Sequence, residues 1–348
     1  MNKKLLFLLV LLLTATTGAW AQDPTYSVKM ANATDAEAAN WTIASGQSSV
    51  KGNEADGLTG LSEGAEVTVT YSGSKKVKSV KAVKKVDPKL ATPLTIEAIT
   101  PGIISVSNPK EGMQYSKNGG AKTAVTTDAI DVAEGDKVQF YGKGTSITSY
   151  GSNVMIECTQ ITGSGNGFTC KVYGNIMSLV DEENFAKATT LSDSYTFKFL
   201  FYNNPTLTDA SGLLLPATQL QESCYRYMFQ GCTALAAAPA LPATQLAAYC
   251  YESMFDGCSA LTAAPVLPAK KLVNRCYYSM FNYCSNLATV TCLATTGINQ
   301  DNSTSYWLNN AGSAVQDAKT VYTVSTANWP SSDFTVIPAG WTRVNIDN

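Results

Sequence analysis

The sequence contains no histidine among its 348 residues. Without imidazole there can be no Ser-His-Asp triad, no Cys-His pair and no His-ligated metal or haem. Charged side chains are also few, at 15% of the chain, and 25 basic residues nearly balance 27 acidic ones. Such a balance provides no electrostatic attraction towards nucleic acid. We therefore predict a non-enzymatic protein with no catalytic residues, no metal, no cofactor and no nucleic-acid partner.

An apolar run lies at the N-terminus, from Leu5 to Leu13, and it is too short to span a bilayer as a helix. Two lysines precede this run and the small-residue frame Ala19-Trp20-Ala21 follows it. This three-part pattern over residues 1–21 is typical of a secretory signal peptide. We predict that the mature chain begins near Gln22, has no transmembrane segment, and is secreted, periplasmic or at the cell surface.

The sequence pattern of residues 22–170 is typical of short β-strands separated by Gly-rich turns. Alternation such as that in 66–71 predicts a small β domain over 22–86, and its lysine-rich end is typical of a solvated sheet edge. Two prolines in 87–93 disfavour helix and indicate an extended linker. The strands and turns of 94–170 then predict a domain that resembles a β-sandwich.

A 26-residue repeat is the strongest pattern in the chain. Three segments that fill 215–292 share LPA, a Leu three positions later, and then CY, MF, C and L. A fixed period of this length indicates repeats that stack on one another, so each end of the array needs a cap. Within the connector 171–214, residues 197–207 look like a degenerate first repeat. Residues 293–348 are expected to form the C-terminal cap, which Trp307, Trp329 and Trp341 would seal.

The recurring Met, Phe and second Cys of each repeat fall at a helix-like spacing, which predicts that they line one buried face. The predicted core residues are Met228, Phe229, Cys232, Met254, Phe255, Cys258, Met280, Phe281 and Cys284.

Nine cysteines are present, an odd number, so at least one is unpaired in a monomer. In the degenerate repeat Asn204 stands where Cys232 stands in the next, which favours a small buried side chain over a metal ligand. We predict buried free thiols in the repeats. Cys158 and Cys170 flank a Gly-rich turn, and a disulfide between them is plausible in an oxidising compartment.

Tyr225, Tyr251 and Tyr277 recur at the period of the repeat, while the residues beside them vary: Arg226, Glu252 and Tyr278. Repeated tyrosines more often pack between repeats than form a sugar-binding platform. We nevertheless take these six residues as the candidate ligand face. Its partner would be an extracellular protein or a glycan.

The acidic run Asp181-Glu182-Glu183 is the remaining candidate for carboxylate chemistry. A glycosidase holds two carboxylates about 5 to 10 Å apart across a sugar, but adjacent acidic residues more often begin a helix, whose dipole favours them. A carbohydrate-active enzyme or a glycan-binding accessory protein is therefore the alternative to a binding or adhesion module.

The frame CYxxMFxGCxxLxxAPxLPA resembles that of the bacterial BspA-like leucine-rich-repeat surface proteins. Segments 172–179 and 337–342 are also similar to such proteins. The resemblance implies a right-handed solenoid with a parallel sheet on one face, no catalytic residues, and a secreted or cell-surface role in adhesion. We expect a mixed, mainly β fold: two small β domains, then a short right-handed leucine-rich-repeat solenoid with a C-terminal cap.

Overall fold

The structure is a computed structural model, and it divides into two compact units, Met1–Pro88 and Lys89–Asn348. The two units are described separately. The residues that the structure describes are 8–12, 26–30, 41–45, 47–51, 58–61, 68–72, 81–85, 89–143, 157–325, 327, 329 and 337–346. The predicted cleavage site after Ala21 and the first two residues of the predicted linker, 87 and 88, lie outside these residues.

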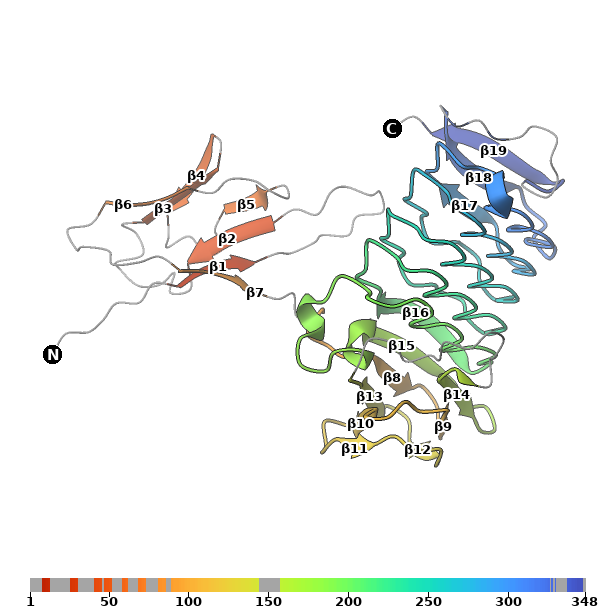
Figure 1. Cartoon of the computed structure of the whole chain (residues 1–348), viewed down its shortest axis with the longest axis horizontal. Coiled ribbons are helices and arrows are strands. Elements are labelled where there is room, and N and C mark those ends of the chain that lie inside the picture. Colours follow the sequence, from red (N-terminus) through yellow and green to blue (C-terminus); the bar gives the residue numbers. More distant parts are fainter. Residues whose placement is uncertain are drawn as a thin grey trace. The chain divides into compact units, whose positions relative to one another are not determined.

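The first unit contains two small sheets, labelled in Figure 1. One has the order β5-β2-β1-β7, made of Leu58–Leu61, Tyr26–Met30, Leu8–Leu12 and Lys81–Lys85. The other has the order β4-β3-β6, made of Ser48–Lys51, Trp41–Ser45 and Thr68–Tyr71. Strand β1 pairs antiparallel with β2 and parallel with β7. It therefore lies inside the sheet, although its residues belong to the predicted signal peptide.

The second unit begins with two sheets whose side chains join one buried cluster. The larger has the order β11-β10-β13-β8-β15-β16, made of Thr123–Ala124, Gln114–Lys117, Lys137–Tyr141, Thr95–Ala98, Cys170–Asn175 and Leu207–Leu214. The smaller has the order β12-β9-β14, made of Ile130–Val132, Gly102–Ser107 and Gln160–Ser164. Two short 3-10 helices follow β15, η3 (Ile176–Leu179) and η4 (Phe185–Lys187). Strand β16 lies beside β15 and begins at Leu207, the last residue of the degenerate repeat, so the sheet runs directly into the repeats.

Each repeat contains a run of consecutive turns rather than a helix. Every fourth residue of this run has a positive φ, as in the first full repeat at Ser223, Tyr227 and Gly231. A left-handed residue at every fourth position interrupts α-helical hydrogen bonding. The helix-like spacing predicted within the repeats is therefore wrong. The period is four, and we call these runs the turn segments: 195–204, 221–232, 247–258, 273–284 and 302–311.

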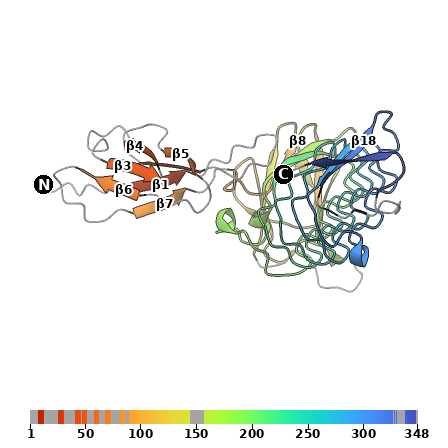
Figure 2. The same ribbon diagram turned by 90° about the horizontal axis from the view of Figure 1, so that it is seen from above.

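Backbone hydrogen bonds tie each turn segment to the next. Alternate N–H groups close turns inside the segment, and the intervening ones donate to the following repeat. Thus Tyr225 N donates to Cys250 O (3.0 Å) and Phe229 N donates to Met254 O (2.9 Å). Between these ladders the rings of Phe201, Phe229, Phe255 and Phe281 stack at 5.3 to 5.6 Å. The turns accordingly lie one above another in Figure 1 and overlap when seen from above in Figure 2.

The predicted leucine-rich-repeat solenoid is wrong, because no parallel sheet runs along all the repeats. The structure is mainly β with several small sheets, none of them closed or solenoid-like. Within residues 195–292 only β16 and β17 (Thr289–Cys292) are strands, and the repeats between them contribute isolated bridges such as Asp209 with Ala237.

Two prolines explain why the parallel sheet does not continue through the first two full repeats. In the first two full repeats the stretch that follows the turn segment contains Pro239 or Pro265, and a proline removes a backbone donor from a sheet. The third repeat has Val290-Thr291-Cys292 there instead, and this stretch forms β17.

The end of the unit covers the last repeat. Parallel strands β18 (Lys319–Val324) and β19 (Trp341–Ile346) extend from β17, and a short 3-10 helix, η5 (Gln300–Asn302), precedes them. The buried rings of Trp307 and Trp329 stack at 5.6 Å, and Trp341 Nε1 donates to Ala311 O (3.4 Å). In the described part of the chain no helix combines the length and apolarity that crossing a membrane requires.

Candidate ligand-binding face

The tyrosines predicted for a ligand face are not accessible. Tyr225, Tyr251 and Tyr277 are buried and stack on one another at 5.7 and 6.2 Å. Because the turn segments have a period of four, two consecutive residues point inwards and the next two point outwards. These tyrosines are the second members of inward pairs, so they pack between repeats, and their neighbours Arg226, Glu252 and Tyr278 begin the outward pairs.

The inward positions carry the core. The nine predicted core residues have no exposed surface: Met228, Phe229, Cys232, Met254, Phe255, Cys258, Met280, Phe281 and Cys284. Cys232, Cys258 and Cys284 are free, and each thiol donates to a carbonyl of the preceding turn, Phe201, Phe229 and Phe255 respectively, at 3.0 to 3.1 Å. Cys158 and Cys170 are also buried, and the structure holds no disulfide between them.

Three columns of outward side chains, with one residue per repeat in each column, form what we call the outer turn face. The columns are Tyr195, Ser223, Tyr249, Arg275 and Asn302; Lys198, Arg226, Glu252, Tyr278 and Ser305; and Phe199, Tyr227, Ser253, Ser279 and Tyr306. Arginine and tyrosine are concentrated here. The face therefore combines fixed charge with aromatic surface.

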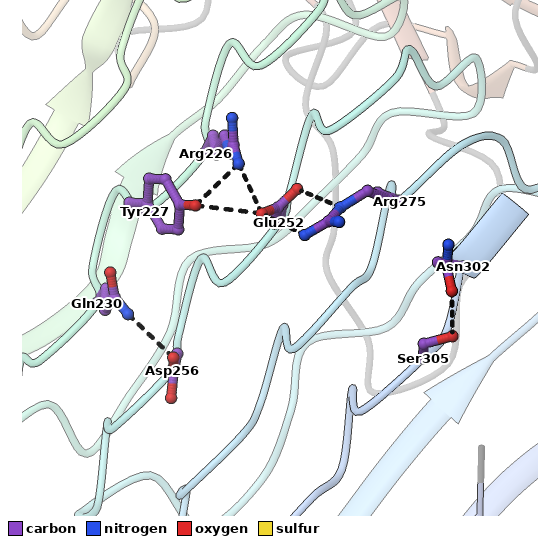
Figure 3. Close-up of polar contacts among 8 residues, drawn as sticks. All are labelled: Arg226, Tyr227, Gln230, Glu252, Asp256, Arg275, Asn302 and Ser305. Atoms are coloured by element: carbon purple, nitrogen blue, oxygen red, sulfur yellow. Dashed lines mark hydrogen bonds and ion pairs between the residues drawn. The ribbon is translucent and has the colours of Figure 1, made fainter. Parts of the chain in front are cut away.

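Glu252 lies at the centre of this face, between two arginines (Figure 3). Its Oε1 accepts from Arg226 Nη2 at 2.7 Å, from Arg275 Nη2 at 3.1 Å and from the Tyr227 hydroxyl at 3.1 Å. Its Oε2 accepts from Arg275 Nε at 3.1 Å. Only 2% of the side chain is exposed. A carboxylate so buried needs this degree of compensation, because removing a lone charge from water is costly.

The two guanidinium groups also lie over tyrosine rings. Arg226 is 4.7 Å from the ring centre of Tyr227 and 5.1 Å from that of Tyr249. Arg275 is 5.6 Å from Tyr249 and 3.8 Å from Tyr278. Cation–π contacts of this kind restrict where each guanidinium can point. Both arginines are partly exposed, so they present oriented donors to solvent.

Exposed aromatic rings continue the face beyond Arg275. Tyr278 meets Tyr306 edge to face at 5.7 Å, and 46% of Tyr306 is exposed. Tyr283, at an outward position of the third repeat, is 58% exposed.

Tyr227, Tyr249, Arg275 and Tyr306 were not identified from the sequence. The signal that could have found them is the four-residue period, which places them outwards.

One further outward position of the turn segments carries amides and one carboxylate: Gln230, Asp256, Asn282 and Asn309. Gln230 Nε2 donates to Asp256 Oδ2 at 2.9 Å, and Asn309 Nδ2 donates to Asn282 Oδ1 at 3.0 Å. Burial raises the pKa of Asp256 to about 6, although hydrogen bonds from Gln230 and Asn282 oppose the increase. Figure 3 shows the Gln230–Asp256 pair and, in the last turn, Ser305 donating to Asn302.

In the acidic run 181–183, the carboxylates of Asp181 and Glu182 already have local partners. Asp181 Oδ1 accepts from the backbone N–H of Asn184 (2.9 Å), just before η4. Glu182 pairs with Lys122 (2.8 Å) and Lys143 (3.0 Å), and these partners lower its pKa. Across the described residues, no group of three or more His, Cys, Asp or Glu is arranged to hold a metal ion.

Comparison with known proteins adds no relative to this description. No model of a protein family, no curated protein and no solved structure matches this chain.

Proposed function

We propose that the protein is an exported binding or adhesion module whose ligand, an extracellular protein or a glycan, is recognised by the outer turn face without chemical turnover. The observation that carries the proposal is the Arg226–Glu252–Arg275 cluster. One buried carboxylate orients two partly exposed guanidinium groups against tyrosine rings.

The chemistry of this cluster suits recognition. Tyrosine and arginine are enriched among the residues that dominate binding energy at interfaces. A side chain held in place before binding loses less conformational freedom when the ligand arrives. Arg275 and Tyr278 are fixed in this way, and the exposed Tyr283 and Tyr306 extend the available aromatic surface.

Export is supported by the signal-peptide pattern of residues 1–21, and adhesion by the similarity of the repeat frame to BspA-like surface proteins. The ligand would then be met outside the cytoplasm. These two features concern the sequence alone, and they are independent of the geometry of the outer turn face.

The test is a binding screen of the purified mature chain against glycans and extracellular matrix proteins, with product analysis in parallel. The double variant Tyr278→Ala/Tyr306→Ala should weaken binding of the ligand found by at least about tenfold, since loss of interface aromatics costs more than 1 kcal/mol each at central positions. Both side chains reach solvent, so the variant should stay folded by circular dichroism.

The matched control is Val266→Ala, which alters the exposed last side chain of the second repeat, away from the turn segments. It should bind like the unchanged protein. Equal binding by the double variant would overturn the assignment of the face. Turnover of a glycan that disappears when one carboxylate is replaced would instead support a carbohydrate-active enzyme.

A further inference from the structure

Tyr283 is a bulky residue in a backbone conformation that usually belongs to glycine or asparagine. Its φ is 56°, in the left-handed region, where a large side chain is strained. The equivalent residues of the other turn segments are of the two types that tolerate this conformation: Asn203, Gly231, Gly257 and Asn310. Tyr283 therefore costs the fold stability that glycine or asparagine would not.

Packing does not offset this strain. Tyr283 is 58% exposed, more than any other large apolar or aromatic side chain that the structure describes. Among the described residues its hydroxyl makes no hydrogen bond and its ring meets no other ring. Other left-handed tyrosines do have partners: Tyr227 hydrogen-bonds to a carboxylate, Tyr249 lies beside two guanidinium groups, and Tyr306 meets a second ring. A strained conformation that local contacts do not explain points to a function for the side chain.

Amide groups lie beside Tyr283. They belong to the outward position that carries Gln230, Asp256, Asn282 and Asn309, which we call the amide row. Tyr283 N donates to Asn309 O at 2.9 Å, and Asn309 Nδ2 donates to Asn282 Oδ1 at 3.0 Å, so the ring and these amides occupy one patch. In the described part of the chain Gln230 Oε1 and Asn309 Oδ1 accept no hydrogen bond, and both reach solvent.

The backbone next to Tyr283 carries no side chain in the two preceding repeats. Gly257 and Gly231 stand at the position of Tyr283 there, and both are partly exposed. Gly257 N donates to Asn282 O at 2.8 Å, which places this bare backbone against the amide row. Glycine allows a ligand to approach the main chain closely. A chain of flat rings can therefore run from Tyr283 along Gly257 and Gly231.

The chemistry of the patch matches a neutral sugar. An amide both donates and accepts hydrogen bonds, as each sugar hydroxyl does. The apolar C–H face of a pyranose fits an exposed aromatic ring, while a few placed polar groups fix its orientation. Asp256 is the only ionisable side chain in the amide row, and its carboxylate would repel an acidic sugar.

We propose that Tyr283 and the amide row bind a neutral oligosaccharide. One ring stacks on Tyr283 and bonds to Asn309, and the chain continues along Gly257 and Gly231 to Gln230. The inference rests on the function proposed above, since it selects a glycan as the ligand. It also adds a contact surface beyond the three columns of the outer turn face.

The first measurement separates strain from packing. Asparagine already occupies this position in two other turn segments, so Tyr283→Asn should have a midpoint of urea unfolding equal to or higher than that of the unchanged protein. Val266→Ala, an exposed change outside the turn segments, should leave the midpoint unchanged. A lower midpoint in Tyr283→Asn would show that the ring is structural and would overturn the proposal.

The second measurement is calorimetry of sugar binding, with cellohexaose, maltohexaose, mannohexaose and galactohexaose as neutral probes. At least one should bind, and Tyr283→Asn should weaken its binding at least about fivefold, as expected for the loss of one contact aromatic. Tyr283→Phe retains the ring and should bind like the unchanged protein. Asn309→Leu, similar in size but without the amide, should weaken binding about fivefold through one lost hydrogen bond. Binding of no probe, or unchanged affinity in Tyr283→Asn or Asn309→Leu, would overturn the site.

Nitration of tyrosines in the unchanged protein locates the sugar without any variant. The bound probe should reduce nitration of Tyr283, whereas the partly exposed Tyr115 of β10 should react equally with and without it. Equal nitration of Tyr283 in both samples would place the sugar elsewhere and overturn the proposal.

The outcomes separate this site from the function proposed above. A probe whose affinity depends on Tyr283 and is indifferent to Tyr278→Ala/Tyr306→Ala would keep the sugar site and reject the outer turn face as the contact surface. An extracellular protein whose binding requires Tyr278 and Tyr306, with no probe bound, would keep the proposed function and overturn the sugar site.

Discussion

At the scale of single residues, one inward column shows what each position requires. Cys232, Cys258 and Cys284 each donate to a carbonyl of the preceding turn. In the degenerate repeat Asn204 donates from Nδ2 to Ile161 O at 3.3 Å, and its Oδ1 accepts from Thr206. A thiol and an amide are interchangeable here because both are small and can satisfy a buried carbonyl. Burial also keeps the thiols protonated, with the pKa of Cys232 raised to about 12.

Asp256 should make the stability of the second unit depend on pH. Its pKa is about 6 in the folded chain, against an ordinary value of 3.8, so the folded state retains this proton to higher pH than the unfolded state. The contribution of Asp256 to stability is therefore complete below about pH 4 and is lost as the pH rises through about 6. Asp256→Asn preserves the acceptor for Gln230 and cannot ionise.

Urea unfolding between pH 4 and 7.5 tests this effect. Relative to the unchanged protein, Asp256→Asn should gain unfolding free energy between pH 4 and 6 and be the more stable protein at pH 7. The exposed Asp317→Asn is the control and should run parallel to the unchanged protein. The opposite slope would show that Asp256 is stabilised as a carboxylate.

At the scale of elements, the turn segment replaces both the helix and the strand as the unit of stacking. Every second N–H of a turn segment donates to a carbonyl of the next repeat, so a segment on its own would leave half of its donors unpaired. Stacking pairs them and at the same time buries the Phe and Tyr columns. The β16 and β17 strands appear only where the prolines of the repeat are missing.

Phe255→Ala should destabilise the repeats strongly. The ring is fully buried and stacks on Phe229 and Phe281 at 5.6 Å on each side. Its removal should cost about 3 to 5 kcal/mol, the usual range for Phe→Ala in a core. Since each repeat contacts only its neighbours, few interfaces share the loss. Val266→Ala, an exposed change in the same repeat, should cost less than about 0.5 kcal/mol.

Hydrogen exchange on Phe255→Ala locates the effect. Protection should fall over residues 195–312, whereas residues 41–51 of the first unit should keep theirs. Retained protection throughout the repeats would contradict the packing described for Phe255, and equal loss in both units would show that they unfold together.

At the scale of the whole molecule, export and folding of the first unit are linked. Signal cleavage is expected after Ala21, because Ala19 and Ala21 fit the frame that signal peptidase recognises. Cleavage would remove β1, the strand that lies between β2 and β7. The mature first unit must then pair β2 and β7 differently from the full chain.

Mass spectrometry of the exported protein should show Gln22 as the first residue. Hydrogen exchange of the mature and full-length proteins should differ in β2 and β7 and agree over residues 157–325. An exported protein that still begins at Met1 would contradict cleavage and leave β1 in its sheet.

The sequence by itself determined the repeat length, the inward Met, Phe and Cys positions and the tryptophans at the end, because these follow from a spacing and from apolar side chains. It did not determine the period of four or the absence of a continuous sheet. Those depend on left-handed residues such as Tyr227 and on hydrogen bonds between repeats, which form only on stacking.

For the outer turn face too, the sequence identified some of the residues, and only the tertiary structure gave their arrangement. The residues Arg226, Glu252 and Tyr278 were visible as variable positions, but the candidate face also included their tyrosine neighbours, which the structure buries. Only the tertiary structure placed Glu252 between arginines 26 residues before and 23 residues after it. Which charges meet within a stack depends on which repeats are neighbours and not on the composition of any one repeat.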